Sequence, residues 1–189
     1  MIVVKVGGSL YDWPGLGPAL RAFVAALDPA PVLVVSGGGG FADAVRMLHR
    51  VHGFTEEQAH WLAIDSLWPA AMFLSELLGA GLTDSLTATG DRVSVFDVTT
   101  YCRSYPVPLP HSWEVTTDSL AAWVARAVRA DQLLLLKSVD VPPGTPWDEA
   151  AARGWVDGYF TRALAGFAGR TEAVNLRTWG GNALAGGSR

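Results

Sequence analysis

Residues 2–9 read IVVKVGGS, and residues 32–40 read VLVVSGGGG. Each stretch is a run of apolar, mostly β-branched residues followed directly by glycines. Such runs predict strands that are buried on both faces, as in a parallel sheet. Apolar residues at helical spacing follow them over 16–27 and 41–51. The two stretches therefore predict a pair of parallel strand–helix units.

The alternation of strands and helices continues along the chain. Apolar runs predict strands over 93–97, 132–136 and 171–175, and helical patterns cover 55–78, 117–130 and 154–167, with a short helix after 175. We therefore expect a three-layer α/β/α sandwich with a mainly parallel sheet. No repeat, low-complexity segment or linker divides the sequence, so we expect one domain over 1–189.

The helix predicted over 55–78 is apolar on nearly all sides. This indicates burial between layers or against a second copy of the chain, and we expect a homodimer or a higher homo-oligomer. Asp65, Pro69 and Glu76 lie within the most apolar part of this segment and argue against a membrane span.

Composition excludes several classes of protein. Half of the 189 residues are apolar, 17% are charged and the net charge is −4, which argues against disorder. A mildly acidic chain without basic runs is not expected to bind nucleic acid. Cys102 is the only cysteine, so no intramolecular disulfide forms, and the start MIVVKVGGSL lacks a signal peptide's apolar core. We expect a cytoplasmic protein.

The first candidate site is Lys5 with Gly7, Gly8 and Ser9. In a parallel α/β sheet, ligands bind beyond the carboxyl ends of the strands. Glycines there let backbone N–H groups approach an anion, and Lys5 adds a positive charge that is costly inside an apolar strand unless it is used. The alternative is a tight turn with a solvated lysine.

The second candidate site is the run of four glycines after the second strand. A plain turn needs one or two, so Gly37, Gly38 and Gly39 predict a phosphate site beside a helix N-terminus. Phe41 and Ala42 follow where a Walker A loop needs Lys-Ser/Thr. A loose G-x-G-x-x-A match leaves an NAD-linked oxidoreductase as an alternative, but the expected acidic residue does not end the next strand.

Two later segments complete the set of candidate residues. Thr116 or Thr117 can cap the helix that follows, which leaves Asp118 free to orient lysines or a metal-bound phosphate. Lys137 ends an apolar strand and could hold a phosphate, while Asp140 could contact ribose or magnesium. Ordinary strand-end charges are the alternative for this pair. Two anion sites with cations and a carboxylate between them favour phosphoryl transfer, which needs alignment and charge neutralisation more than a protein nucleophile.

The order of these motifs resembles the amino-acid-kinase family, which includes acetylglutamate, uridylate and isopentenyl phosphate kinases. The resemblance covers essentially the whole chain and implies ATP as donor, with Mg²⁺ held by its phosphates and by no protein cage. It implies that Lys5 bridges the phosphates, that Gly8 and Gly38 donate to them, and that Asp118 organises the catalytic lysines. It places the acceptor on the N-terminal side and the nucleotide over about 130–189. The implied nucleotide contacts are Asp140, Asn175 and Arg177.

The sequence departs from the family pattern at two of these positions. Family members often carry a second catalytic lysine shortly after an Asp-Gly pair, and Arg162 follows Asp157-Gly158 here. The strand-end motif usually has Thr or Ser where this chain has Lys137. We expect Arg162 to be catalytic, and leave open whether it or Lys137 replaces the second lysine.

Two stretches resemble a subfamily, the kinases of methanofuran biosynthesis, which phosphorylate 5-(aminomethyl)-3-furanmethanol phosphate to its diphosphate. They are residues 60–64 and 111–120. The implied acceptor-binding residues are His60, Asp65, Trp113 and Thr117, with Asp65 or Glu114 near an ammonium group. Alternatives are an isopentenyl phosphate or acyl-phosphate-forming kinase, or a non-catalytic nucleotide-binding protein.

Overall fold

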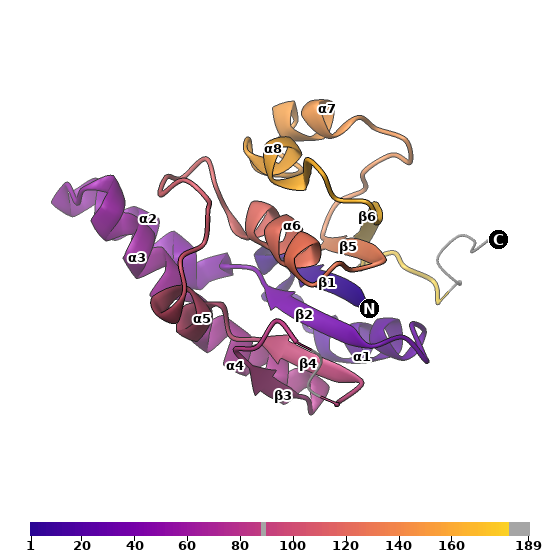
Figure 1. Ribbon diagram of the computed structural model, residues 1–189. Helices are drawn as coiled ribbons and strands as arrows, with labels where there is room; N and C mark the ends of the chain where they lie inside the picture. The colour runs from indigo at the N-terminus through magenta and orange to yellow at the C-terminus, as the bar shows by residue number, and fades with distance from the viewer. Residues whose placement is uncertain (88–89, 182–189) are drawn as a thin grey trace.

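The computed structural model describes residues 1–87 and 90–181, and a parallel sheet forms its centre (Figure 1). The strands are β1 (Ile2–Val6), β2 (Val32–Ser36), β3 (Gly81–Thr83), β4 (Val93–Phe96), β5 (Gln132–Lys137) and β6 (Arg170–Asn175). They lie in the order β3-β4-β2-β1-β5-β6, and every neighbouring pair is parallel. The two strands quoted first, β1 and β2, are therefore neighbours near the middle of the sheet.

Helices cover both faces of this sheet. The helices are α1 (Leu16–Ala25), α2 (Gly39–His52), α3 (Glu56–Asp65), α4 (Leu67–Leu78), α5 (Val98–Ser104), α6 (Thr117–Ala127), α7 (Trp147–Ala152) and α8 (Phe160–Leu164), with a short 3₁₀ helix η1 (Gly8–Leu10). One core packs α1 and α4 on the sheet, and the other packs α5, α6, α7 and α8 on the opposite face. Helices α2 and α3 extend beyond the sheet (Figure 1). The predicted α/β/α sandwich is confirmed.

The alternation of side chains along β1 decides where Lys5 points. Val4 and Val6 belong to the core that contains α1, whereas Val3 belongs to the core that contains α6. Successive residues of a strand face opposite sides of the sheet, so Lys5 faces α6. Leu133 and Leu135 of β5 share that core, and Lys137 follows them with the same parity.

The helix predicted over 55–78 is in fact two helices, α3 and α4, with Ser66 between them. Pro69 provides the physical reason. A proline ring clashes with the carbonyl group four residues earlier, which here belongs to Asp65, the last residue of α3. Within the first turn of α4 the missing proline N–H costs nothing, because that donor has no intrahelical partner.

Short elements were missing from the prediction. The three-residue strand β3, the seven-residue helix α5 and the six-residue helix α7 are each too short to show a hydrophobic period. The short helix expected after 175 is not found over 176–181, and residues 182–189 lie outside the described residues.

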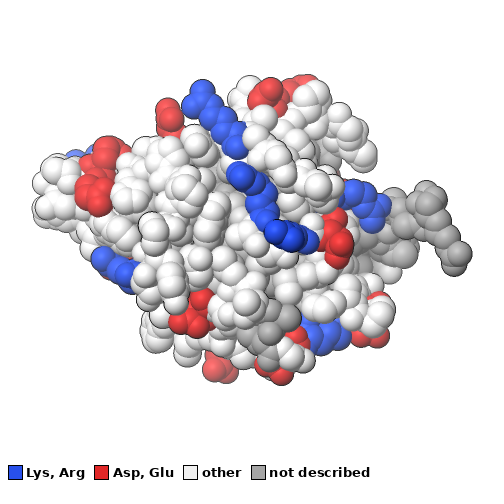
Figure 2. Space-filling view, viewed as in Figure 1, with Lys and Arg blue, Asp and Glu red and all other residues white. Residues whose placement is uncertain are grey.

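The segment Glu56–Leu78 is long and apolar enough to pass a composition test for a membrane span, with 28% of the tested window buried. A single segment of this kind is weak evidence, because the core helix of a soluble protein passes the same test. On the face drawn in Figure 2, uncharged side chains predominate, and basic and acidic groups are scattered among them.

Candidate active site

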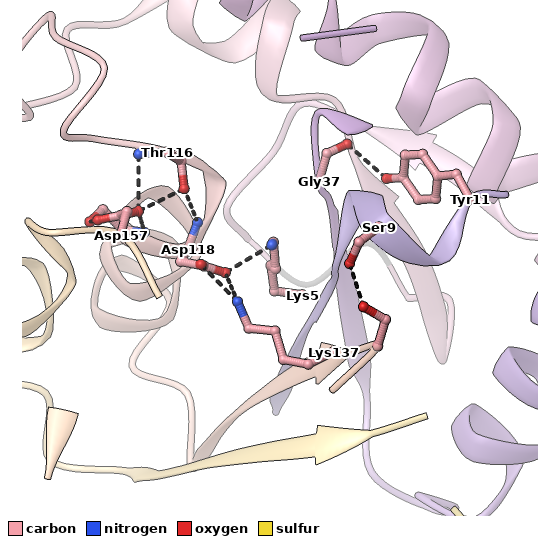
Figure 3. Close-up of polar contacts among 10 residues, drawn as sticks. Lys5, Ser9, Tyr11, Gly37, Thr116, Asp118, Lys137 and Asp157 are labelled. Atoms are coloured by element: carbon pink, nitrogen blue, oxygen red, sulfur yellow. Dashed lines mark hydrogen bonds and ion pairs between the residues drawn. The ribbon is translucent and has the colours of Figure 1, made fainter. Parts of the chain in front are cut away.

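Two lysines and one aspartate form a buried cluster at the carboxyl edge of the sheet. The Nζ atom of Lys5 lies 2.8 Å from an Asp118 carboxylate oxygen, and that of Lys137 lies 2.8 Å from both oxygens. The side chains converge from β1, β5 and the first turn of α6 (Figure 3). All three residues are buried: Lys5 and Asp118 are 5% exposed, and Lys137 is 8% exposed. Lys5 and Lys137 are the only two lysines in the sequence, which has twelve arginines.

Charge compensation explains how three ionised groups remain buried together. Burial alone would raise the pKa of the Asp118 carboxyl, but the ammonium groups of Lys5 and Lys137 outweigh this and hold it below its usual range. Burial, and then the charge of Lys5, lower the pKa of Lys137 to about 8, while Asp118 opposes this shift. The cluster carries two positive charges and one negative charge, so a net positive charge remains for an anion.

The glycine loops after β1 and β2 pack directly on each other. A Cβ atom on Gly8 would collide with the backbone of Gly39, and one on Gly37 would collide with the backbone of Gly8. The Tyr11 hydroxyl donates to the Gly37 carbonyl at 2.8 Å and fixes the same contact (Figure 3). Part of the glycine run is therefore required by packing between the loops, in addition to any ligand.

Two cavities meet at this cluster. The large cavity, of about 1110 Å³, contains Lys5, Gly8, Gly38 and Gly39 in its wall. The small cavity, of about 380 Å³, is lined by Asp118, Lys137, Ser138 and neighbouring residues. Ser9 and Thr116 line both cavities, so the cluster lies at their junction. The hydroxyl groups of Ser9 and Ser138 lie 2.9 Å apart there.

Comparison with known proteins identifies this arrangement. No protein-family model matches the chain. The [5-(aminomethyl)furan-3-yl]methyl phosphate kinase of Methanocaldococcus jannaschii is 25% identical over 146 residues, which are 74% of this chain and 67% of that protein. This match and the fold support the resemblance to the amino-acid-kinase family that the order of the motifs indicates.

Several solved structures of kinases share the fold of this chain. Uridylate kinase from Archaeoglobus fulgidus superposes with a TM-score of 0.68 at 18% identity, over 92% of this chain and 90% of that one. UMP kinase from Bacillus anthracis gives 0.66 at 15% identity, over 95% and 88%. Isopentenyl phosphate kinase from T. acidophilum gives 0.55 at 14% identity, over 93% and 91%. The relatives are phosphotransferases, so the NAD-linked oxidoreductase alternative is not supported.

The second cation that contacts Asp118 in the structure is Lys137, and not Arg162. Arg162 is exposed on α8, with its guanidinium 5.9 Å from the Tyr159 ring, and it lines neither cavity. The structure therefore does not bring Arg162 to the cluster. The physical reason is the register of β5, which directs Lys137 to the α6 face of the sheet and to Asp118.

Asp157 is a site residue to which the sequence analysis gave no role. Its carboxylate accepts hydrogen bonds from the backbone N–H and hydroxyl groups of both Thr116 and Ser119, and from the N–H of Tyr159. These bonds join the segment before α8 to the first turn of α6. Asp118 lies between the two anchored residues, so Asp157 fixes its position. The Asp157-Gly158 pair was the available signal in the sequence.

Replacing Asp157 by alanine should lower the free energy of unfolding by about 2–3 kcal/mol, because buried donors of α6 lose a charged acceptor. Urea unfolding at pH 7 measures this change, and kcat should fall as Asp118 loses its support. The exposed Asp148 in the first turn of α7 provides a matched control. A stability loss no larger than that of Asp148→Ala would contradict the anchoring role.

The predicted nucleotide residues lie near the small cavity without lining it. Asn175 donates from its side-chain amide to Asp140 at 2.9 Å, so the ends of β5 and β6 are joined. The Arg177 guanidinium donates to the Ser9 carbonyl at 3.2 Å and lies 3.3 Å from Asp12. A nucleotide contact of these residues stays a prediction.

The predicted acceptor residues divide into two groups. His60, Trp113 and Thr117 line the large cavity, and their contact with an acceptor stays a prediction. Asp65 and Glu114 do not line it. The Asp65 carboxylate instead receives two hydrogen bonds from Arg103, at 3.1 and 2.6 Å, which leaves it committed to an ion pair.

Proposed function

We propose that this kinase transfers the γ-phosphoryl group of ATP to the phosphate of [5-(aminomethyl)furan-3-yl]methyl phosphate and forms the diphosphate. The observation that carries the proposal is the Lys5–Asp118–Lys137 cluster at the junction of two cavities. Phosphoryl transfer requires two anions to be aligned and their charge to be neutralised at one place. The cytoplasm, where ATP is available, is the proposed location.

The two cavities suggest how the substrates divide. The acceptor would occupy the large cavity, with its phosphate at Lys5, Gly8 and Gly38, and its ring among the aromatic side chains of the wall. ATP would enter from the small cavity, with its γ-phosphate near Lys137. The Asp118 carboxylate binds both lysines and would hold their ammonium groups in place, which makes it a positioning residue in this proposal.

Magnesium would enter with the nucleotide. The described residues contain no group of three or more His, Cys, Asp or Glu side chains arranged to hold a metal ion. In this proposal the ion is carried mainly by phosphate oxygens, which is the usual mode for Mg²⁺. Bound Mg²⁺ would neutralise phosphate charge, and the lysines would act on the remaining charge.

The experiment is a coupled assay of ADP formation with a panel of acceptors. Mg²⁺–ATP is supplied with [5-(aminomethyl)furan-3-yl]methyl phosphate, with isopentenyl phosphate, with a carboxylate, or with no acceptor. We expect turnover that requires the furan phosphate, with a diphosphate product visible by ³¹P NMR. If isopentenyl phosphate were the only acceptor that supports turnover, it would be the substrate in place of the furan phosphate. ATP binding without turnover for every acceptor would refute the proposal.

Turnover should fall as the pH rises through about 8, because Lys137 loses its proton there. The same shift affects stability with the opposite sign. The folded pKa lies below the ordinary value of 10.5, so the unfolded chain binds more protons between pH 8 and 10.5, and the free energy of unfolding rises with pH across this range.

Two measurements check this pH dependence. Lys137→Arg should keep its charge and flatten the fall of kcat above pH 8. Because the chain has only two lysines, NMR of ¹³C-labelled lysine gives two side-chain signals, and the Lys137 signal should titrate near pH 8. A Lys137 signal that titrates at 10 or above would contradict the prediction.

A further inference from the structure

Two imidazole rings form part of the wall of the large cavity. His60 of α3 and His111 of the segment before α6 lie parallel, with ring centroids 3.8 Å apart and an interplanar angle of 8°. The Trp61 indole makes T-shaped contacts with both rings, with centroid distances of 5.2 and 5.6 Å. All three side chains line the cavity. Residues about fifty positions apart in the sequence thus make one aromatic surface.

Glu57 fixes this surface from behind. One carboxylate oxygen lies 2.6 Å from Nδ1 of His111, and the other accepts a hydrogen bond from Nε1 of Trp61 at 2.7 Å. Glu57 does not line the cavity itself. One turn of α3 therefore places Glu57, His60 and Trp61 so that a single carboxylate holds rings from two separate segments. Hydrogen bonds between Glu57 and these rings also hold its pKa below the ordinary value.

The surroundings of the two stacked rings differ. Two protonated imidazoles at 3.8 Å would repel each other, and the Glu57 carboxylate contacts the ring of His111. Burial, and then the charge of His111, lower the pKa of His60 to about 4, with Arg103 acting in the same direction and Glu57 against it. Asp65, the other nearby carboxylate, is paired with Arg103. At neutral pH His60 is uncharged.

We propose that His60 recognises the acceptor as an uncharged stacking surface, and that Glu57 is a positioning residue that fixes this surface through His111 and Trp61. The inference rests on the proposed function for the identity of the acceptor. It implies an acceptor with a planar, unsaturated ring at this end of the cavity, because the stacked imidazoles and the Trp61 indole line it and an aromatic surface packs best against a flat ring. The acceptor phosphate is then left to Lys5 and the glycine loops, where positive charge remains.

A pair of substitutions separates stacking from hydrogen bonding. His60→Phe keeps a ring face and removes the ring nitrogens, whereas His60→Asn keeps a hydrogen-bonding group and removes the ring. With [5-(aminomethyl)furan-3-yl]methyl phosphate as the probe, His60→Phe should leave the acceptor KM within about threefold, and His60→Asn should raise it about tenfold. The ATP KM and kcat should change little in either variant.

The role of Glu57 is tested by comparing the acceptor KM with the ATP KM and kcat. Glu57→Ala should raise the acceptor KM about tenfold with an unchanged ATP KM, and Glu57→Gln, which keeps an acceptor for Trp61, should recover part of the loss. A general structural role would instead lower kcat and the melting temperature and alter both KM values. An unchanged acceptor KM in Glu57→Ala would overturn the positioning role.

An NMR titration tests the charge of His60 independently of turnover. The chain has four histidines, and the His60 signal is assigned by its loss in His60→Phe. It should titrate near pH 4, and a value of 6 to 7 would overturn the inference. If the wild type is active but His60→Phe raises the acceptor KM as much as His60→Asn does, the stacking inference is wrong while the proposed function stands. A wild type that is inactive with every acceptor refutes the proposed function, and the titration still decides the charge on His60.

Discussion

Replacing Lys5 by alanine is expected to lower kcat by a factor of about 10²–10³, the usual cost of removing one group that stabilises developing charge in a transition state. Lys5 lines the large cavity and is held by Asp118 at 2.8 Å, so its ammonium group is oriented before substrates bind. The loss should appear in kcat more than in either KM. Steady-state ADP formation under saturating substrates measures it.

A matched control is needed because the variant also removes one positive charge from the chain. Arg50→Ala removes a charge from the exposed end of α2 and should leave kcat unchanged. Lys5→Arg retains the charge on a larger, planar group, and we expect only partial activity from it. If Lys5→Ala kept a kcat within threefold of the wild type, Lys5 would not be a catalytic residue.

Asp118→Ala is expected to lower the free energy of unfolding by about 3–5 kcal/mol, because it leaves two buried ammonium groups without their shared carboxylate. Activity should also be lost, since neither lysine remains in position. The depressed pKa of Asp118 gives the sign of the pH effect. The stabilisation is present above the unfolded pKa of about 4 and is lost as the pH falls through the folded value. Urea unfolding at pH 7 and at lower pH measures both effects.

Two further variants show whether charge is the cause. In Asp118→Ala with Lys137→Met, one uncompensated ammonium group is removed, and part of the lost stability should return. Asp131→Ala removes an exposed carboxylate that pairs with the N-terminus, and it should have little effect. If Asp131→Ala and Asp118→Ala lower the free energy of unfolding equally, the burial of the Asp118 ion pairs does not make them more stabilising than an exposed pair.

The fold followed from the sequence because local patterns encode it. The apolar runs of β1, β2 and β5 are long enough to identify buried strands, and the glycines after β1 and β2 mark where the chain turns toward a helix. Prediction was wrong where the signal was short or indirect. The α3–α4 boundary depended on the ring of Pro69 against a carbonyl group one turn earlier, and the short helices α5 and α7 showed no period.

The sequence by itself determined the family resemblance, the parallel sheet and the candidate roles of Lys5 and Asp118, because these depend on motifs and periods within short segments. Only the tertiary structure decided that Lys137, and not Arg162, reaches Asp118, and that Asp65 is occupied by Arg103. The contact between Glu57 and His111 is likewise visible only in the tertiary structure. Such pairings join elements far apart in the chain, and they are set by strand register, side-chain parity and helix packing, which no local pattern records.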